Sequence, residues 1–328
     1  MRAFVLRSFG SADRLRLEEV ATPAPAEGEA LVRVRGTSVN PYDWHHMRGE
    51  PLVARLMPGG PPLRHPVAAV LGCDVAGRVE SVRPGVTRVS PGDDVYALIP
   101  HGAFAEYVRV PVDLLAPKPA GLSYEQAAAV PMAAVTALVA VRDRGRVGPG
   151  QRVLVNGASG GVGTFAVQLA RAFGARADGV CRAANAELVR SLGADTVIDR
   201  GTVDFTRCGK RYDLLLDIAG TRQVPACRRV LTPTGTMALI GGPAGRWLQP
   251  AGHVFAAMAM GRLVRQRIAL TETVISPDRQ EDLRTLAKLI EDGHLSPVIG
   301  ARYPFAELPQ AIADQEGGRI PGKVVITL

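Results

Sequence analysis

A glycine-dense turn between an apolar run and a helical pattern constrains this chain more than any other segment. Residues 153–155 read Val-Leu-Val, which is typical of a buried parallel strand, and residues 161–173 carry apolar side chains at helical spacing. Between them lies Gly161-x-Gly163-x-x-Ala166, a spacing that lets a backbone turn approach the diphosphate of a dinucleotide. The N–H groups at the start of the helix then face the phosphates. The residues expected to bind this diphosphate are Ser159, Gly160, Gly161, Val162 and Gly163.

Length and composition indicate a globular protein of two domains. The chain has 328 residues, of which 47% are hydrophobic and 21% charged, and no apolar run reaches the roughly 18 residues that span a bilayer. The apolar part of the first ten residues is too short for a secretion signal, so we expect a cytoplasmic protein without membrane partners. The four cysteines show no CxxC spacing, which predicts reduced thiols and no zinc knuckle.

The net charge of +8 comes almost wholly from arginine, because lysine occurs only at positions 118, 210, 288 and 323. A basic protein can bind nucleic acid. Here the arginines are scattered without a long basic run, and only 5% of the residues are aromatic and able to stack on bases. This distribution argues against a nucleic-acid partner.

The first third of the chain is typical of antiparallel β structure. Residues 1–35 alternate between apolar and polar side chains with Pro and Gly between the runs, which predicts strands. Asn40-Pro41 predicts a turn followed by a short helix. Residues 51–66 have no period and read as a loop that could cover a site. The segments from 70 to about 111 again predict strands, so this part resembles a small irregular barrel.

From Ser123 onward strands and helices alternate. Ser123 and Gln126 form a capping box before a helical pattern, and the alternation that follows predicts a doubly wound parallel sheet. The predicted strand 176–181 fits its place poorly because it contains Asp178 and Gly179. It is retained because the alternation of strands and helices requires a strand there. The predicted strands are 153–155, 176–181, 196–199, 212–217, 235–241 and 267–274, and the helices are 161–173, 184–192, 222–230, 252–265 and 278–292.

The last segment returns to β character. Residues 322–328 end the chain as a strand that we expect to pair back into the N-terminal barrel. The predicted division is therefore a first domain over residues 1–122, a dinucleotide-binding domain over 123–296, and a return to the first domain over 297–328.

Six motifs together resemble the medium-chain dehydrogenase/reductase superfamily, in its zinc-free, quinone-oxidoreductase-like branch. They are Asn40-Pro41-Tyr42-Asp43, residues 71–77 (LGCDVAG), 91–96 (PGDDVY), 102–108 (GAFAEYV), 158–163 (ASGGVG) and 322–325 (GKVV). The resemblance covers the whole chain. It implies a GroES-like β-barrel domain, discontinuous in sequence, plus a Rossmann domain with the site between them. It also implies hydride transfer from NADPH to an electron-poor acceptor, and commonly a homodimer.

The residues at the zinc positions of this superfamily differ from those of its alcohol dehydrogenases. Those enzymes have a cysteine where this chain has Asn40, and Gly-His-Glu where it has Gly72-Cys73-Asp74. Two adjacent candidate ligands do not make the tetrahedral site that zinc prefers. We therefore expect no metal, and an acceptor that is already polarised, such as a quinone or an enone.

The end of the second parallel strand bears on cofactor choice. NAD-preferring sites hold an acidic residue there for the ribose 2′-hydroxyl. This chain has no acid between Val180 and Asn185, and Arg182 can grip a 2′-phosphate with two hydrogen bonds. Arg200, after the third strand, can assist. We expect NADPH as cofactor, and the alternative is that both arginines are simply solvated.

The nicotinamide should lie near the carboxyl ends of the strands. The candidate contacts are Asn40, Thr136, Ala219 with Gly220, Gly241, Gly242 and Lys323, the last through the closing motif of the resemblance. Thr136 could hydrogen-bond the carboxamide or only its own helical turn. Asn40 is the residue expected to position the ring or the acceptor.

Reduction of a quinone or enone also needs a proton. Tyr42, His45 and His46 follow Asn40 on the segment expected to border the cleft, and a histidine suits general acid chemistry. The alternatives are that the histidines only pack and that water supplies the proton. Asp43 is expected to brace the loop.

Three functions share these motifs. The first is an NADPH-dependent quinone or enone reductase, and the second is an enoyl reductase or tailoring enzyme of a biosynthetic pathway. The third is a non-catalytic NADPH-binding sensor, for which the unusual pairing of Arg182 with Ala184 leaves room. The apolar helix expected at residues 255–260 contains two methionines and could cover an apolar acceptor, although ordinary core packing is the interpretation we favour.

Overall fold

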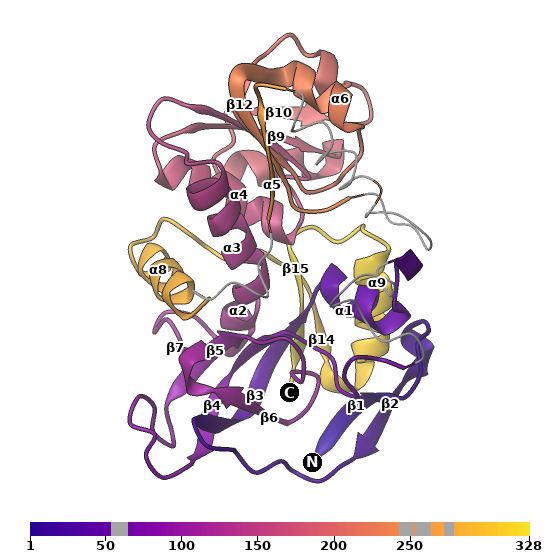
Figure 1. Ribbon diagram of the computed structural model, residues 1–328, viewed down its shortest axis with the longest axis vertical. Helices are drawn as coiled ribbons and strands as arrows, with labels where there is room; N and C mark the ends of the chain where they lie inside the picture. The colour runs from indigo at the N-terminus through magenta and orange to yellow at the C-terminus, as the bar shows by residue number, and fades with distance from the viewer. Residues whose placement is uncertain (54–64, 243–251, 253–263, 272–278) are drawn as a thin grey trace.

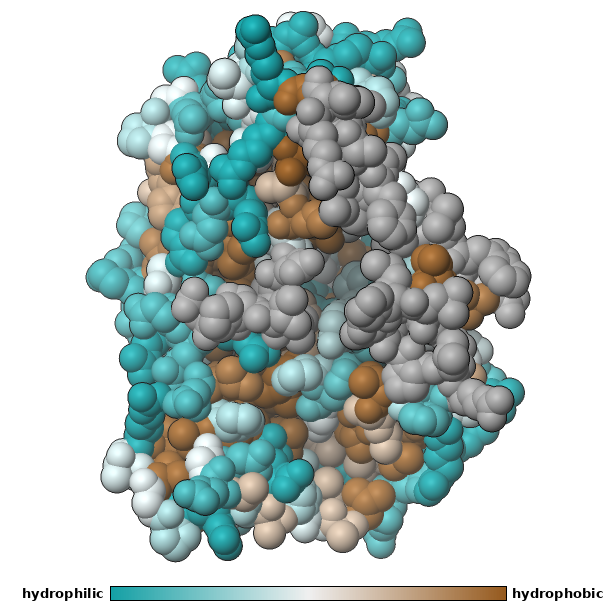
Figure 2. All heavy atoms as spheres, viewed as in Figure 1, coloured by the Kyte–Doolittle hydropathy of each residue, from teal (hydrophilic) through white to brown (hydrophobic). Residues whose placement is uncertain are grey.

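The computed structural model describes residues 1–53, 65–242, 252, 264–271 and 279–328. A parallel sheet with its helices forms the upper half of the view in Figure 1, and a largely antiparallel sheet forms the lower half, where both termini lie. Hydrophilic residues cover the top and left margin of this face, and hydrophobic residues gather further in (Figure 2). Within these described residues, no helix combines the length and apolar character that crossing a bilayer requires.

The upper sheet has six parallel strands in the order β10-β9-β8-β11-β12-β13. Numbered along the chain this order is 3-2-1-4-5-6, which is the doubly wound dinucleotide-binding arrangement, with the reversal between β8 and β11. The prediction of a doubly wound parallel sheet is thus confirmed. The strands are β8 (Arg152–Asn156), β9 (Arg176–Cys181), β10 (Thr196–Asp199), β11 (Tyr212–Asp217), β12 (Leu231–Leu239) and β13 (Arg267–Leu270).

The helices between residues 124 and 291 follow the predicted apolar patterns, with one break. The capping box of Ser123 and Gln126 is formed in both directions, at 2.9 and 3.2 Å. The helix that follows divides at Pro131, which lacks the N–H that a continuous helix needs. The helices are α2 (Tyr124–Ala128), α3 (Pro131–Leu138), α4 (Gly161–Ala172), α5 (Ala186–Ser191), α6 (Val224–Cys227) and α8 (Arg279–Glu291), with a π-helical turn at Val139–Arg144.

The doubtful strand β9 forms as predicted, because both awkward residues have a packing role. The Asp178 carboxylate accepts hydrogen bonds from Lys210 Nζ at 3.0 Å and from the Tyr212 hydroxyl at 2.8 Å. A Cβ on Gly179 would lie 2.6 Å from Val189 Cγ1, so only glycine lets α5 approach the strand this closely. A buried carboxylate with these donors is tolerated in a central strand.

The lower sheet follows the order β14-β15-β3-β4-β5-β7, and β6 also pairs with β3. Strand β15 runs antiparallel to β3, with Val324 opposite Val39, so the predicted return of the C-terminus is confirmed. Its strands are β3 (Glu29–Val39), β4 (Asp74–Val82), β5 (Asp94–Leu98), β6 (Tyr107–Pro111), β7 (Leu115–Pro117), β14 (Ile299–Pro304) and β15 (Lys323–Thr327). Strands β1 (Arg2–Leu6) and β2 (Leu15–Glu19) form a separate hairpin.

The lower half also contains α1 (Pro41–Arg48), which is the short helix predicted after Asn40, and α9 (Leu308–Glu316). They lie side by side, and Trp44 Nε1 donates to Gln315 Oε1 at 3.0 Å. Most of the loop predicted at 51–66, nearly all of the helix predicted at 252–265, including 255–260, and residues 272–274 of the last predicted strand lie outside the described residues.

Candidate functional site

A cleft of about 400 Å³ opens between the carboxyl ends of the parallel strands and the lower sheet. Its walls come from the ends of β8, β9 and β11, from the turn before α4, from the β3–α1 junction and from β15. It therefore lies where the strand order reverses between β8 and β11, which is the place where ligands bind in such sheets. All five residues expected at the diphosphate precede or begin α4, and four of them, Ser159 to Val162, line this cleft.

The glycine turn is shaped as a cradle. Gly157 has a φ of 99°, and a Cβ on Gly163 would lie 2.1 Å from the Gly157 carbonyl oxygen, so neither end of the turn accepts a side chain without strain. The backbone N–H of Gly322 donates to the Ser159 carbonyl oxygen at 2.8 Å, which joins the strand β15 region to the turn. This shape fits the diphosphate of a dinucleotide at the N-terminus of α4.

Positive side chains mark the part of the cleft at the ends of β9 and β10. Arg182 and Arg200 both line it, as expected, together with Asn185, whose Nδ2 donates to Ser159 Oγ at 3.1 Å. Arg319, which follows α9, also lines the cleft and was not anticipated from the sequence. Among the described residues that line the cleft, none carries a carboxylate. The electrostatics of the cleft therefore favour an anionic ligand.

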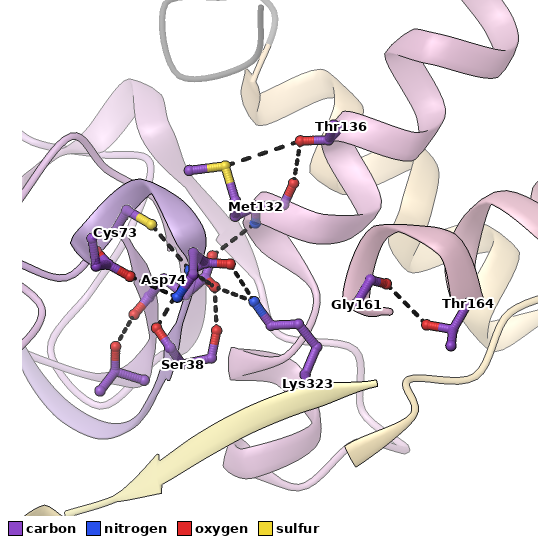
Figure 3. A network of polar contacts seen from close by, with 11 residues as sticks. Ser38, Cys73, Asp74, Met132, Thr136, Gly161, Thr164 and Lys323 are labelled. Atoms are coloured by element: carbon purple, nitrogen blue, oxygen red, sulfur yellow. Dashed lines mark hydrogen bonds and ion pairs between the residues drawn. The ribbon is translucent and has the colours of Figure 1, made fainter. Parts of the chain in front are cut away.

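At the other part of the cleft a buried polar network joins Asn40, Asp74 and Lys323. Figure 3 shows the side chains of Asp74 and Lys323 pointing toward each other. Lys323 Nζ donates to Asn40 Oδ1 and lies 3.2 Å from Asp74 Oδ2, and Asn40 Nδ2 donates to the same Asp74 oxygen at 2.9 Å. Asn40 and Lys323 line the cleft, whereas Asp74 lies behind them. The Asn40 amide, expected to hold the ring or acceptor, is thus held by charged neighbours.

Asp43 and His45, both on α1, make contacts of different kinds. Asp43 accepts the Asn40 backbone N–H at 2.8 Å, which is the bracing role expected of it. His45 Nδ1 lies 3.1 Å from the Glu50 carbonyl oxygen, and its ring packs on Trp44 at 3.8 Å between centroids. Burial lowers the pKa of His45, so the imidazole is neutral at pH 7.

Tyr42 forms a ring cluster that the sequence does not reveal. Its ring centroid lies 4.0 Å from that of His46 and 5.6 Å from that of His101. Burial raises the pKa of Tyr42, lowers that of His46, and lowers that of His101 to about 4. All three rings are therefore uncharged at neutral pH. Neither Tyr42 nor His45 is among the described residues that line the cleft.

The remaining candidates divide between cleft and interior. Ala219 lines the cleft. The Thr136 hydroxyl donates to the Met132 carbonyl oxygen at 2.6 Å, which is the alternative considered for it, and Thr136 is not among the lining residues. Gly241 and Gly242 follow β12, and a Cβ on Gly241 would lie 2.2 Å from the Ile218 carbonyl oxygen. Gly241 thus allows the ends of β11 and β12 to approach closely.

Asn156 lines the cleft and was missed in the sequence. It is the last residue of β8, and its Nδ2 donates to Asp217 Oδ1, at the end of the neighbouring strand β11, at 2.7 Å. A polar residue at the carboxyl end of a central strand, directly before the glycine turn, is a signal that could have identified it. Nothing in the sequence around Arg319 gives a comparable signal.

Comparison with known proteins agrees with this architecture. Residues 26–120 match the alcohol dehydrogenase GroES-like domain, and residues 192–326 match a family described as zinc-binding dehydrogenase. The chain is 30% identical to the chloroplast envelope quinone oxidoreductase homolog of Arabidopsis thaliana, over 99% of this chain and 98% of that protein. It is 32% identical to the mitochondrial NAD(P)H oxidoreductase RTN4IP1 of Homo sapiens, over 100% and 89%. The quinone oxidoreductase structure from Coxiella burnetii has a TM-score of 0.83 at 26% identity and covers 100% and 99%.

A nucleotide cradle at the reversal of a parallel sheet, facing a GroES-like barrel, defines a nicotinamide-dependent oxidoreductase. The chain belongs to the medium-chain dehydrogenase/reductase superfamily and is quinone-oxidoreductase-like.

Proposed function

We propose that this protein is a zinc-independent oxidoreductase that transfers hydride from NADPH to a quinone or an α,β-unsaturated carbonyl compound. The observation that carries the proposal is the composition of one cleft. It combines a glycine cradle with Arg182 and Arg200, and no described lining residue carries a carboxylate.

The preference for NADPH follows from charge. NADPH differs from NADH by a 2′-phosphate, which Arg182 can grip through two charge-assisted hydrogen bonds. Arg182 and Arg200 both line the cleft, where no described lining residue carries a carboxylate, so both guanidinium groups are available to a ligand. An acidic residue at this position would instead favour NADH.

Independence from zinc follows from the donor set. Cys73 and Asp74 are the candidate ligands by position, but the Asp74 carboxylate is already bonded to Lys323, Asn40 and the Met132 N–H. Among the described residues, no group of three or more His, Cys, Asp or Glu side chains gathers into a metal site. Without a Lewis acid, an acceptor that is already electron-poor suits the site best.

The bound cofactor supplies hydride, and the reaction consumes one further proton as the acceptor is reduced and the nicotinamide oxidised. Asn40 and Lys323 orient the nicotinamide end of the cleft. Tyr42 and His45 are the proton donors expected from the sequence, but neither is among the described residues that line the cleft, and burial raises the pKa of Tyr42, which makes its hydroxyl a weaker acid than that of an ordinary tyrosine. His45 uses its Nδ1–H on the Glu50 carbonyl oxygen. Water is the alternative donor.

Two further expectations remain predictions. The homodimer is implied by the superfamily. The cytoplasmic location was expected from the sequence, whereas the relatives named above are described as a chloroplast envelope protein and a mitochondrial protein.

The deciding experiment measures oxidation of NADPH and of NADH by the purified protein, against one panel of quinones and one of enones. We expect NADPH to be oxidised faster than NADH, with no loss of rate after treatment with a chelator. Turnover confined to one enone scaffold would identify a dedicated enoyl reductase. Binding of NADPH without oxidation by any acceptor would favour the sensor, and stoichiometric zinc would contradict the proposal.

A further inference from the structure

Lys323 is a buried cation that lines the nicotinamide part of the cleft. Its alkyl chain crosses the glycine turn, because a Cβ on Gly161 would lie 2.8 Å from Lys323 Cδ. Its side chain is only 4% exposed. The ammonium group has three N–H donors, and two of them go to Asn40 Oδ1 and Asp74 Oδ2. The third has no partner among the described residues.

Asp74 stands directly behind this cation and does not itself line the cleft. Its side chain is fully buried, and its Oδ1 accepts the backbone N–H of Met132, near the start of α3, at 2.7 Å. Its Oδ2 accepts hydrogen bonds from Ser38 Oγ and Asn40 Nδ2, and faces Lys323. One carboxylate therefore holds groups from β3, β15 and α3 in a single arrangement (Figure 3).

The charge of a nicotinamide ring changes during the reaction. The reduced ring is neutral, and the oxidised ring carries one positive charge. A buried ammonium close to the ring and without a counter-charge would disfavour the oxidised form, because charges interact strongly where water is excluded. Asp74 makes the net charge of the pair zero.

We propose that Asp74 is a positioning residue that fixes Lys323 and Asn40 at the nicotinamide end and offsets the charge of Lys323, so that the oxidised ring is accommodated. This inference rests on the proposed function, since it requires the nicotinamide cofactor to bind in this cleft. Asp74 would thus set the relative affinity for the reduced and the oxidised cofactor, in addition to any effect on folding.

The test compares the dissociation constants of NADPH and NADP⁺ in the full-length protein, without an acceptor. Asp74→Asn keeps the size and one acceptor oxygen but removes the charge. We expect it to weaken NADP⁺ binding about tenfold relative to NADPH. A purely structural role would weaken both cofactors equally, and an unchanged ratio would overturn the inference.

Three further variants keep the test decisive if Asp74→Asn does not fold. Lys323→Gln leaves the Asp74 carboxylate without its cation and should therefore strengthen the binding of NADP⁺ relative to NADPH. The double variant Asp74→Asn with Lys323→Gln should restore the wild-type ratio. Asp292→Asn, at an exposed pair with Lys288, is the matched control and should change nothing. A ratio that Lys323→Gln leaves unchanged also overturns the inference.

The same titrations distinguish a failure of this inference from a failure of the proposed function. Binding of both cofactors by the wild-type protein, with a ratio that does not respond to these charges, overturns this inference alone. Failure of the wild-type protein to bind either cofactor overturns the proposed function and the inference together.

Discussion

Gly163 lies against the carbonyl oxygen of Gly157 so closely that a Cβ on Gly163 would be 2.1 Å from that oxygen and 2.7 Å from Ala158 Cα. The contact involves only backbone atoms, which cannot move aside as a flexible side chain can. It fixes the start of α4 against the end of β8. The shape of the whole cradle therefore depends on the absence of a side chain at this position.

Gly163→Ala should distort the turn and destabilise the protein by about 2 kcal/mol, with a loss of NADPH binding of at least about tenfold. Gly160→Ala is the matched comparison, because its φ is −82° and its Cβ would meet only the Gly157 oxygen, at 3.5 Å. It should fold normally but still weaken NADPH, since Gly160 lines the cleft. Urea denaturation and NADPH titration distinguish the two effects. Wild-type NADPH affinity in Gly160→Ala would exclude a close approach of the diphosphate.

The double variant Arg182→Ala with Arg200→Ala should weaken NADPH binding about 100-fold and leave NADH unaffected, because only NADPH carries the 2′-phosphate. Arg176→Ala serves as the control, since Arg176 is an exposed arginine at the opposite end of β9 from Arg182. The measurement is the ratio of the two cofactor dissociation constants. An equal loss for both cofactors would place the arginines elsewhere than at the 2′-phosphate.

Asn40→Ala should lower kcat about tenfold or more while the KM for NADPH changes little. The Asn40 amide bridges Lys323 and Asp74, so its loss disturbs the orientation of the reacting end and leaves the diphosphate cradle intact. Steady-state kinetics with a quinone acceptor separates the two constants. A raised KM for NADPH at unchanged kcat would instead indicate a role in binding alone.

The sequence was sufficient for the fold because its signals are local and agree with one another. The apolar run at β8, the glycine turn and the α4 pattern each predict the same unit, and the five other strands repeat the alternation. The return of β15 was predictable from its apolar pattern and its position. The division of the chain at 122 and 296, and the roles of the candidate site residues, stay predictions.

Contacts between distant residues were beyond the sequence. Asp178 appears unsuited to a central strand until Lys210 and Tyr212, more than 30 positions later, are seen to satisfy it. Likewise the amide oxygen of Asn40 accepts a hydrogen bond from Lys323, which is 283 positions away. Arg319 lines the cleft three positions before Gly322, which forms a bridge with the distant Gly160. Each depends on tertiary packing, which local patterns do not encode.

The Asp178 contacts make a prediction about stability. Asp178→Ala should lower the free energy of unfolding by about 2 kcal/mol, because it leaves the Tyr212 hydroxyl buried without its acceptor. Asp292→Ala, which removes an exposed i,i+4 partner of Lys288, should cost less than about 0.5 kcal/mol. Denaturation in urea measures both. Equal effects would mean that water replaces Asp178 as the acceptor of the Tyr212 hydroxyl in the variant.

Asp43 makes the protein's stability depend on pH. Burial raises the pKa of this carboxyl from 3.8 to about 7, and the nearby charge of Asp74 adds to the effect. The Asn40 N–H donates to one oxygen, and the other is buried without a hydrogen-bond partner. Between about pH 4 and pH 7 the folded protein therefore binds one more proton at this site than the unfolded chain does.

It follows that the stability contributed by protonated Asp43 is fully present below the unfolded pKa and is lost as pH rises through 7. Each unit of difference in pKa corresponds to about 1.4 kcal/mol. Asp43→Asn keeps an oxygen that accepts the Asn40 N–H but cannot titrate. Urea denaturation of both proteins from about pH 4.5 to about pH 7.5 should show the wild-type protein losing stability relative to the variant by a few kcal/mol. Parallel curves would show that Asp43 titrates near its unfolded pKa in the native protein.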